Sequence, residues 1–140
     1  MKIKTLTLEN FMIFDSIDVE WSPNINVILG ENSTGKTTLL KAMYSLVKPY
    51  GRSDFLKCTQ MQQEDMIVGK MVGVFRPDEK KIGRMSSRRR GAPKNTKMKV
   101  CTAEGDIIEV SFGSRRENHA DVSVRHSEKS KLCDPVYLPP

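Results

Sequence analysis

The chain has 140 residues, a net charge of +6 and a hydrophobic share of 38 %. This length suffices for one domain with a buried core, although the apolar share is below that of most globular proteins. No apolar run approaches the roughly 18 residues of a membrane span, and the N-terminus alternates polar and apolar residues unlike a signal peptide. The three cysteines form no C-x-x-C pair, so zinc is not indicated and reduced thiols in a cytoplasmic protein are expected.

The first twenty residues predict two strands joined by a turn. Residues 1–8 alternate, but Ile3 lies on the opposite phase from Leu6 and Leu8, so the inner face stays open. Large apolar residues fill the turn at 10–15. Residues 17–21 alternate cleanly and predict a second, half-exposed strand.

A phosphate-loop pattern follows a short turn at residues 22–24. Residues 25–29, INVIL, predict a buried parallel strand. Residues 30–37, GENSTGKT, match Gly, four residues, then Gly-Lys-Ser/Thr. The next residues predict a helix through 47 with one apolar stripe, formed by Leu39, Leu40, Met43, Tyr44, Leu46 and Val47.

The residue types of this loop suit a nucleotide. Gly30 and Gly35 let the backbone N–H groups turn inward as an anion nest at the start of a helix. Lys36 is expected to reach the β- and γ-phosphates, and the Thr37 hydroxyl to ligate Mg²⁺. The predicted nucleotide-binding residues are Gly30, Glu31, Asn32, Ser33, Thr34, Gly35, Lys36, Thr37 and Thr38. The alternative is a glycine-rich turn with an incidental lysine.

The opening "IKTLTLENFMIFDSIDVEWSPNINVILGENSTGKTTLLKAMYSL" resembles the start of ABC-type ATPase heads of the SMC, RecF and OLD-nuclease kind, over about residues 1–48. The resemblance implies an α/β P-loop NTPase lobe of the ABC-ATPase-head type with a flanking antiparallel β subdomain. It also implies that this lobe is incomplete. It also implies that the turn at 10–14 lies near adenine and ribose. Core packing remains the alternative for Phe11 and Phe14.

Beyond the first helix, Asp54 is expected to cap a short helix, and residues 62–74 show helical spacing that Pro77 ends. ABC-type heads use a glutamine to sense the nucleotide's metal. We assign Gln60, Gln62 and Gln63 to a polar helix surface instead.

The basic segment, residues 76–99, holds ten of the 23 basic residues and two of the 17 acidic ones, a local net charge of +8. Arg88, Arg89, Arg90 and Lys94 are therefore candidate contacts to DNA or RNA phosphates. No aromatic residue lies within the segment, so base stacking is not indicated. A solvated loop, or one facing an acidic partner, is the alternative.

From residue 97 the pattern predicts antiparallel strands. A hairpin at 98–112 turns at Glu104 and Gly105, and a third strand covers 120–125. His119 and His126, at the ends of that strand, are expected to be solvated rather than metal ligands. Residues 135–140 predict a buried strand that has just begun.

We therefore expect a single N-terminal ATP-binding lobe over 1–140, divided into 1–48, 49–96 and 97–140. The hydrophobic strand ending in Asp-Glu and the signature loop of ABC-type ATPases do not occur, so truncation is expected and enzymatic activity is uncertain. ATP and Mg²⁺ are the expected cofactors. Expected partners are DNA through the basic segment and either a C-terminal lobe or a homodimer partner.

Three functions follow from these features. The first is ATP binding by the N-terminal lobe of an SMC/RecF/OLD-like ATPase in DNA repair or anti-phage defence, with hydrolysis requiring a further half. The second is a regulatory protein that binds nucleotide without turnover. The third is a small P-loop kinase, which the N-terminal hairpin fits poorly.

Overall fold

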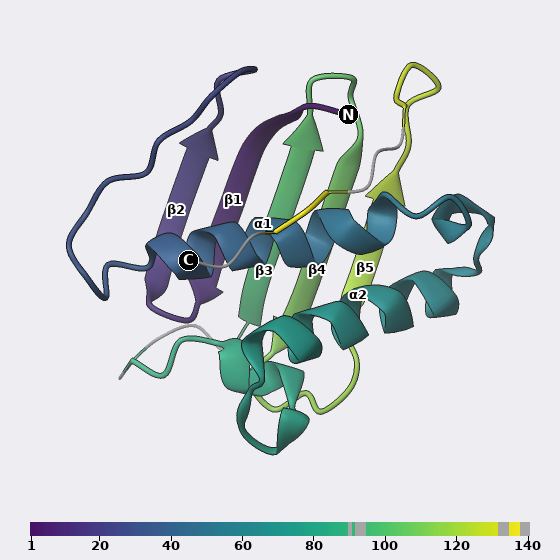
Figure 1. Cartoon of the computed structure of the whole chain (residues 1–140). Helices are drawn as coiled ribbons and strands as arrows, with labels where there is room; N and C mark the ends of the chain where they lie inside the picture. The colour runs from purple at the N-terminus through teal and green to yellow at the C-terminus, as the bar shows by residue number, and fades with distance from the viewer. Residues whose placement is uncertain (90, 92–94, 132–134, 138–140) are drawn as a thin grey trace.

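The computed structural model describes residues 1–89, 91, 95–131 and 135–137. Five strands form one antiparallel sheet in the order β2-β1-β3-β4-β5, and two helices cover one of its faces (Figure 1). The strands are β1 (Ile3–Phe11), β2 (Phe14–Glu20), β3 (Asn95–Thr102), β4 (Ile107–Gly113) and β5 (Asp121–Arg125). The helices are α1 (Lys36–Tyr50) and α2 (Gln60–Phe75), with short 3-10 turns at Phe55–Lys57, Asp78–Lys80 and Ile82–Met85.

The N-terminal hairpin is confirmed, with a tighter turn than expected. Leu6 and Leu8 are fully buried and Ile3 only partly, so the first two face the core. Only Met12 and Ile13 separate the two strands. Met12 has a φ of 52°, in the left-handed region that non-glycine residues seldom adopt.

The C-terminal hairpin and its third strand are also confirmed. β3 pairs with β4, and β4 with β5, so that apolar residues alternate toward the helices. Gly105 makes the β3–β4 turn with a φ of 99°, which a side chain would disfavour.

The second helix begins two residues before the expected stretch because a capping box fixes its start. The Thr59 hydroxyl accepts a hydrogen bond from the Gln62 N–H at 3.3 Å, while the Gln62 side chain accepts one from the Thr59 N–H at 2.9 Å. Gln60 and Gln63 donate to the carbonyls of Val122 and Phe55. All three glutamines thus have structural partners.

Asp54 does not cap the short helix at Phe55–Lys57, contrary to expectation. Its carboxylate instead accepts two hydrogen bonds from the Arg52 guanidinium, at 3.0 and 3.1 Å. A bidentate charged pair competes effectively with a single bond to a backbone N–H.

The predicted parallel strand at residues 25–29 is wrong for this structure. The segment has no regular secondary structure and pairs with no described strand. Ile25, Val27 and Leu29 are 84 %, 74 % and 86 % exposed, and only Ile28 packs partly against the core. β1 already lies between β2 and β3, and among the described residues no strand pairs with 25–29. An apolar pattern shows that a segment would be stabilised by burial. Burial as a strand also requires a neighbouring strand to pair with it.

The strand expected at 135–140 is likewise absent where the structure describes it. Residues 135–137 are not in a strand, and Val136 is 76 % exposed. Residues 138–140 lie outside the described residues.

A buried polar network fixes the end of α1 to the sheet. His126 Nδ1 lies 2.5 Å from the Tyr50 hydroxyl and 3.3 Å from the Asp106 carboxylate. Burial raises the pKa of Asp106, but hydrogen bonds from the Ser127 N–H and the Thr102 hydroxyl outweigh it, so the pKa lies below its usual value. The expectation of a solvated side chain is therefore wrong for His126. The His119 side chain is 73 % exposed, and its Nδ1 lies 3.2 Å from Glu64 Oε1.

Candidate nucleotide-binding loop and basic surface

The phosphate loop (residues 30–37) leads directly into α1. Gly35 stands at the N-cap with φ 90° and ψ 10°, and its carbonyl accepts the first helical hydrogen bond from the Leu39 N–H at 2.8 Å. The first turn of α1 carries no acidic side chain. The positive end of this 15-residue helix is thus directed at the loop, in which Glu31 is the one acidic residue.

Lys36 lies across this loop. Its ammonium donates to the carbonyls of Gly30 and Glu31, both at 2.5 Å. The Thr34 hydroxyl donates to the Glu31 carbonyl at 2.8 Å, which closes the loop upon itself. The ammonium is therefore already held among the backbone groups of the loop.

The remaining loop residues are accessible. Residues 31–34 and Thr37 are exposed, and Thr38 is half-buried. The nine predicted site residues form one continuous stretch, so the fold brings them together by chain connectivity. Among the described residues, no cluster of three or more His, Cys, Asp or Glu could hold a metal ion. The Mg²⁺ contact of the Thr37 hydroxyl stays a prediction.

The β1–β2 turn packs against the phosphate loop. A Cβ added to Gly35 would lie 2.6 Å from both Ile13 Cδ1 and Phe14 Cζ. Phe14 is thus next to the loop, whereas Phe11 is fully buried and packs edge-on against Phe75 with ring centroids 5.2 Å apart. The core alternative is confirmed for Phe11, and proximity of this turn to adenine stays a prediction.

The basic segment is less cationic in the fold than in the sequence. Arg88 pairs with Asp78 at 3.2 Å and Arg89 with Asp15 at 2.5 Å. Lys81 lies between Glu79 and Glu117, at 2.6 and 3.2 Å. Arg90 and Lys94 lie outside the described residues. All the paired acidic side chains are more than half exposed, so these ion pairs are weak and exchangeable.

The middle of the basic segment is hydrogen-bonded to the end of β1 and to the β1–β2 turn. The Ser87 N–H donates to the Asn10 carbonyl at 3.0 Å, and the Met12 N–H donates to the Met85 carbonyl at 2.8 Å. The buried Thr96 hydroxyl also donates to the Asn10 carbonyl, at 2.8 Å. The β1–β2 turn therefore contacts the phosphate loop on one side and the basic segment on the other.

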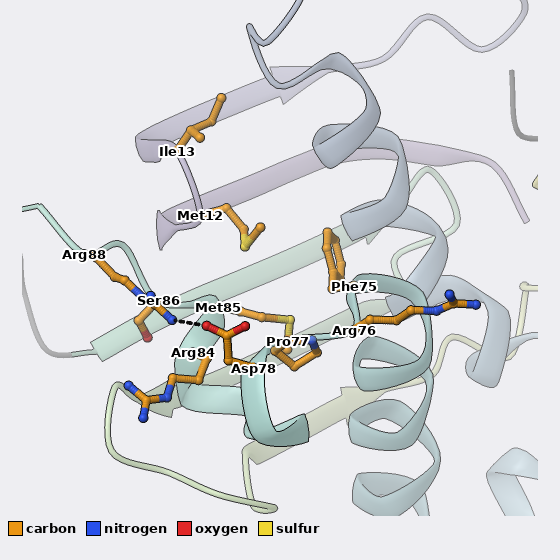
Figure 2. A pocket seen from close by; sticks show the side chains of 10 residues that line it. All are labelled: Met12, Ile13, Phe75, Arg76, Pro77, Asp78, Arg84, Met85, Ser86 and Arg88. Atoms are coloured by element: carbon orange, nitrogen blue, oxygen red, sulfur yellow. Dashed lines mark hydrogen bonds and ion pairs between the residues drawn. The ribbon is translucent and has the colours of Figure 1, made fainter.

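Sequence reasoning missed a hollow of about 390 Å³ at this junction (Figure 2). Three stretches of the chain line it: the β1–β2 turn, the end of α2 and the basic segment. Its lining residues are Met12, Ile13, Phe75, Arg76, Pro77, Asp78, Arg84, Met85, Ser86 and Arg88. The β1–β2 turn is remote in sequence from the other two stretches, so no local pattern signals the hollow.

Comparison with known proteins identifies the family. A family model described as "AAA ATPase domain" matches residues 1–131. The chain belongs to this AAA ATPase domain family. None of the helices that the structure describes has the length and apolar character needed to cross a bilayer.

Among the relatives of this AAA ATPase domain are proteins called "DNA replication and repair protein RecF". The protein from Halalkalibacterium halodurans is 50 % identical over 46 residues, and that from Staphylococcus haemolyticus is 46 % identical over 46 residues. Each match covers 33 % of this chain and 12 % of the relative. The chain thus aligns with a small part of these longer proteins.

A solved structure described as "Structural biochemistry of ATP-driven dimerization and DNA stimulated activation of SMC ATPases" has the same fold. It matches with a TM-score of 0.57 and 12 % identity, covering 91 % of this chain and 71 % of the solved one. The expected class, a P-loop lobe of ABC-type SMC/RecF-like ATPases with an antiparallel sheet, is confirmed.

Proposed function

We propose that this AAA ATPase domain binds Mg-ATP as the N-terminal lobe of an SMC/RecF-like ATPase acting in DNA repair or anti-phage defence. The observation that carries the proposal is the phosphate loop. A left-handed glycine opens a helix whose first turn is free of acidic side chains, and Lys36 lies across the loop mouth. This arrangement suits the polyphosphate of a nucleotide.

The residues present fit the nucleotide in distinct roles. Lys36 exchanges its two carbonyl partners for β- and γ-phosphate oxygens, and the backbone N–H groups around Gly35 donate to phosphate. The exposed Thr37 hydroxyl supplies an oxygen for Mg²⁺, which when bound neutralises part of the phosphate charge. The half-buried Thr38 adds a contact to the α-phosphate.

Hydrolysis, in this proposal, requires residues from outside this chain. An Asp-Glu pair after a hydrophobic strand and a signature loop are absent from its sequence. The unpaired backbone and exposed apolar side chains of residues 25–29 support pairing with strands supplied in cis or in trans. A C-terminal lobe or a second head would supply them.

DNA is the proposed partner of the basic segment. Arg88 and Arg89 expose 63 % and 48 % of their side chains, and the acidic partner of each is itself exposed. Arg89 also donates to the Ser87 hydroxyl at 3.1 Å. Phosphates can replace those acidic partners at little cost. Arg90 and Lys94 remain predicted contacts.

The test is calorimetric titration of the chain with ATP and magnesium. Lys36→Ala should abolish binding because it removes the charge that faces the phosphates. The matched control is Lys41→Ala, which removes the same charge from the same helix and should leave the affinity unchanged. Equal affinity in the Lys36 variant and the unmodified chain contradicts the site.

Turnover separates the alternatives. The chain by itself should bind ATP with negligible hydrolysis. Hydrolysis that depends on Lys36 would favour the kinase or an unrecognised catalytic carboxylate. Binding that remains unproductive with every candidate head partner would favour a regulatory protein.

A further inference from the structure

We propose that the hollow lined by Met12, Phe75 and Met85 binds one unstacked base of a nucleic acid whose neighbouring phosphates contact Arg84 and Arg88. The inference rests on the proposed DNA contact of the basic segment and specifies its form. It reverses the expectation from sequence that base stacking is absent, because the fold places beneath the arginines an aromatic ring that the segment itself lacks.

The lining of the hollow suits a flat apolar group. Met12, Phe75, Pro77 and Met85 provide its apolar walls, and Figure 2 shows the Met12 side chain extending toward Met85 and Phe75. Its volume of about 390 Å³ is in the range of small-ligand pockets. Methionine and phenylalanine are both favourable partners for an aromatic base.

Met12 is held in position rather than loosely exposed. Its φ of 52° is unusual for a methionine, and its N–H is fixed to the Met85 carbonyl at 2.8 Å. The side chain nevertheless remains 36 % exposed. An apolar side chain kept accessible by an unfavourable backbone conformation is a common feature of binding sites.

The charges at the rim select the ligand. Arg84 and Arg88 are exposed, and Arg88 reaches across to Asp78 at 3.2 Å (Figure 2). Two exposed guanidinium groups beside an apolar hollow complement a ligand with phosphates next to a base. The Asp78 carboxylate can accept a hydrogen bond from the amino group of a base, which thymine lacks.

The test measures binding of labelled single strands of about 12 nucleotides to the full chain at low salt, by fluorescence anisotropy. A strand with abasic central positions keeps the phosphates and loses the bases. We expect the abasic strand to bind roughly five- to tenfold more weakly. Oligo-dC should bind more tightly than oligo-dT.

Variants divide the contributions of base and phosphate. Met12→Asn keeps a residue that tolerates the left-handed region, and it should remove the difference between intact and abasic strands. Arg88→Gln should weaken both strands about equally and reduce the salt slope by about one. Asp78→Ala, which removes the acceptor, should remove the preference for oligo-dC. Arg52→Gln, which breaks a similarly exposed pair with Asp54, is the control and should change nothing.

Four other outcomes would contradict the proposal, each in a different way. Equal binding of intact and abasic strands overturns the base site while leaving the phosphate contact in place. The same holds if Met12→Asn weakens ATP binding alone, because the hollow then belongs to the nucleotide site. Displacement of the strand from the hollow by an acidic peptide with an aromatic residue, at equal concentration, assigns the hollow to a protein and also overturns it. Absence of binding by any strand refutes the DNA contact itself.

Discussion

Apolar side chains are buried in the antiparallel sheet but mostly exposed in the segment that leads to the phosphate loop. In the sheet, Leu6 and Leu8 are fully buried beneath the helices, and each strand has a hydrogen-bonded neighbour. In residues 25–29, the side chains of Ile25, Val27 and Leu29 are 74–86 % exposed, only Ile28 is partly buried, and no described strand pairs with the segment. Every strand of the sheet pairs within this chain, whereas the segment that leads into the phosphate loop pairs with no described strand.

The largest expected effect tests this contrast directly. Leu8→Ala should reduce the free energy of unfolding by about 2–5 kcal/mol, since it leaves a cavity in a closed core. Val27→Ala should change it by less than about 0.5 kcal/mol, because its side chain is already 74 % exposed. Urea denaturation measures both. A Val27 variant as unstable as the Leu8 variant would show that residues 25–29 are buried in solution.

A second prediction concerns the junction of the two regions. Gly35→Ala should cost about 1–3 kcal/mol of stability, because φ is 90° and the new Cβ would lie 2.6 Å from Ile13 and Phe14 atoms. It should also abolish Mg-ATP binding by displacing the loop. Thermal melts and calorimetry measure the two effects. Gly91→Ala, at φ 76° with open space around it, is the control for backbone strain without a clash.

A third prediction concerns the pH dependence of the stability of the antiparallel sheet. The pKa of Asp106 is lower in the folded chain than its unfolded value of about 3.9. Its stabilising effect is therefore fully present above the unfolded pKa and is lost as the pH falls through the folded pKa. Asp106→Asn should cost about 1–3 kcal/mol near pH 7 and flatten the loss of stability below about pH 4. An unchanged acid limb in urea titrations at several pH values would contradict this role.

The smallest expected effect has the opposite sign. Gly69 lies inside α2, and a Cβ added there meets no atom within 4 Å. Gly69→Ala should therefore stabilise the chain by about 0.5–1 kcal/mol through helix propensity alone. Thermal denaturation measures the gain, and nucleotide affinity should stay the same. A loss of stability would mean that another surface packs on this face of α2.

Much of the antiparallel sheet and its two helices could be predicted from the sequence because the patterns that indicate these elements are local. Alternation defined both hairpins, and helical spacing located α2, although its start depended on a Thr59–Gln62 cap that we had not identified. The phosphate loop was recognisable because its residues are contiguous. Its role in binding nucleotide stays a prediction.

The errors arose where the outcome depends on distant residues. The pattern of residues 25–29 indicates a need for burial but not whether a partner exists. His119 and His126 flank the same strand, yet only His126 meets Tyr50 and Asp106. The hollow beside the basic segment combines Met12 with Phe75 and Met85, which no window of sequence contains.

The exposed segment at 25–29 also has a practical consequence for handling the protein. Ile25, Val27 and Leu29 expose alternating apolar side chains on backbone that pairs with no described strand, which makes residues 25–29 a template for strand addition between copies. Concentrated samples of the chain should therefore self-associate through residues 25–29. Val27→Lys should reduce this self-association, because a charged side chain disfavours strand pairing between copies.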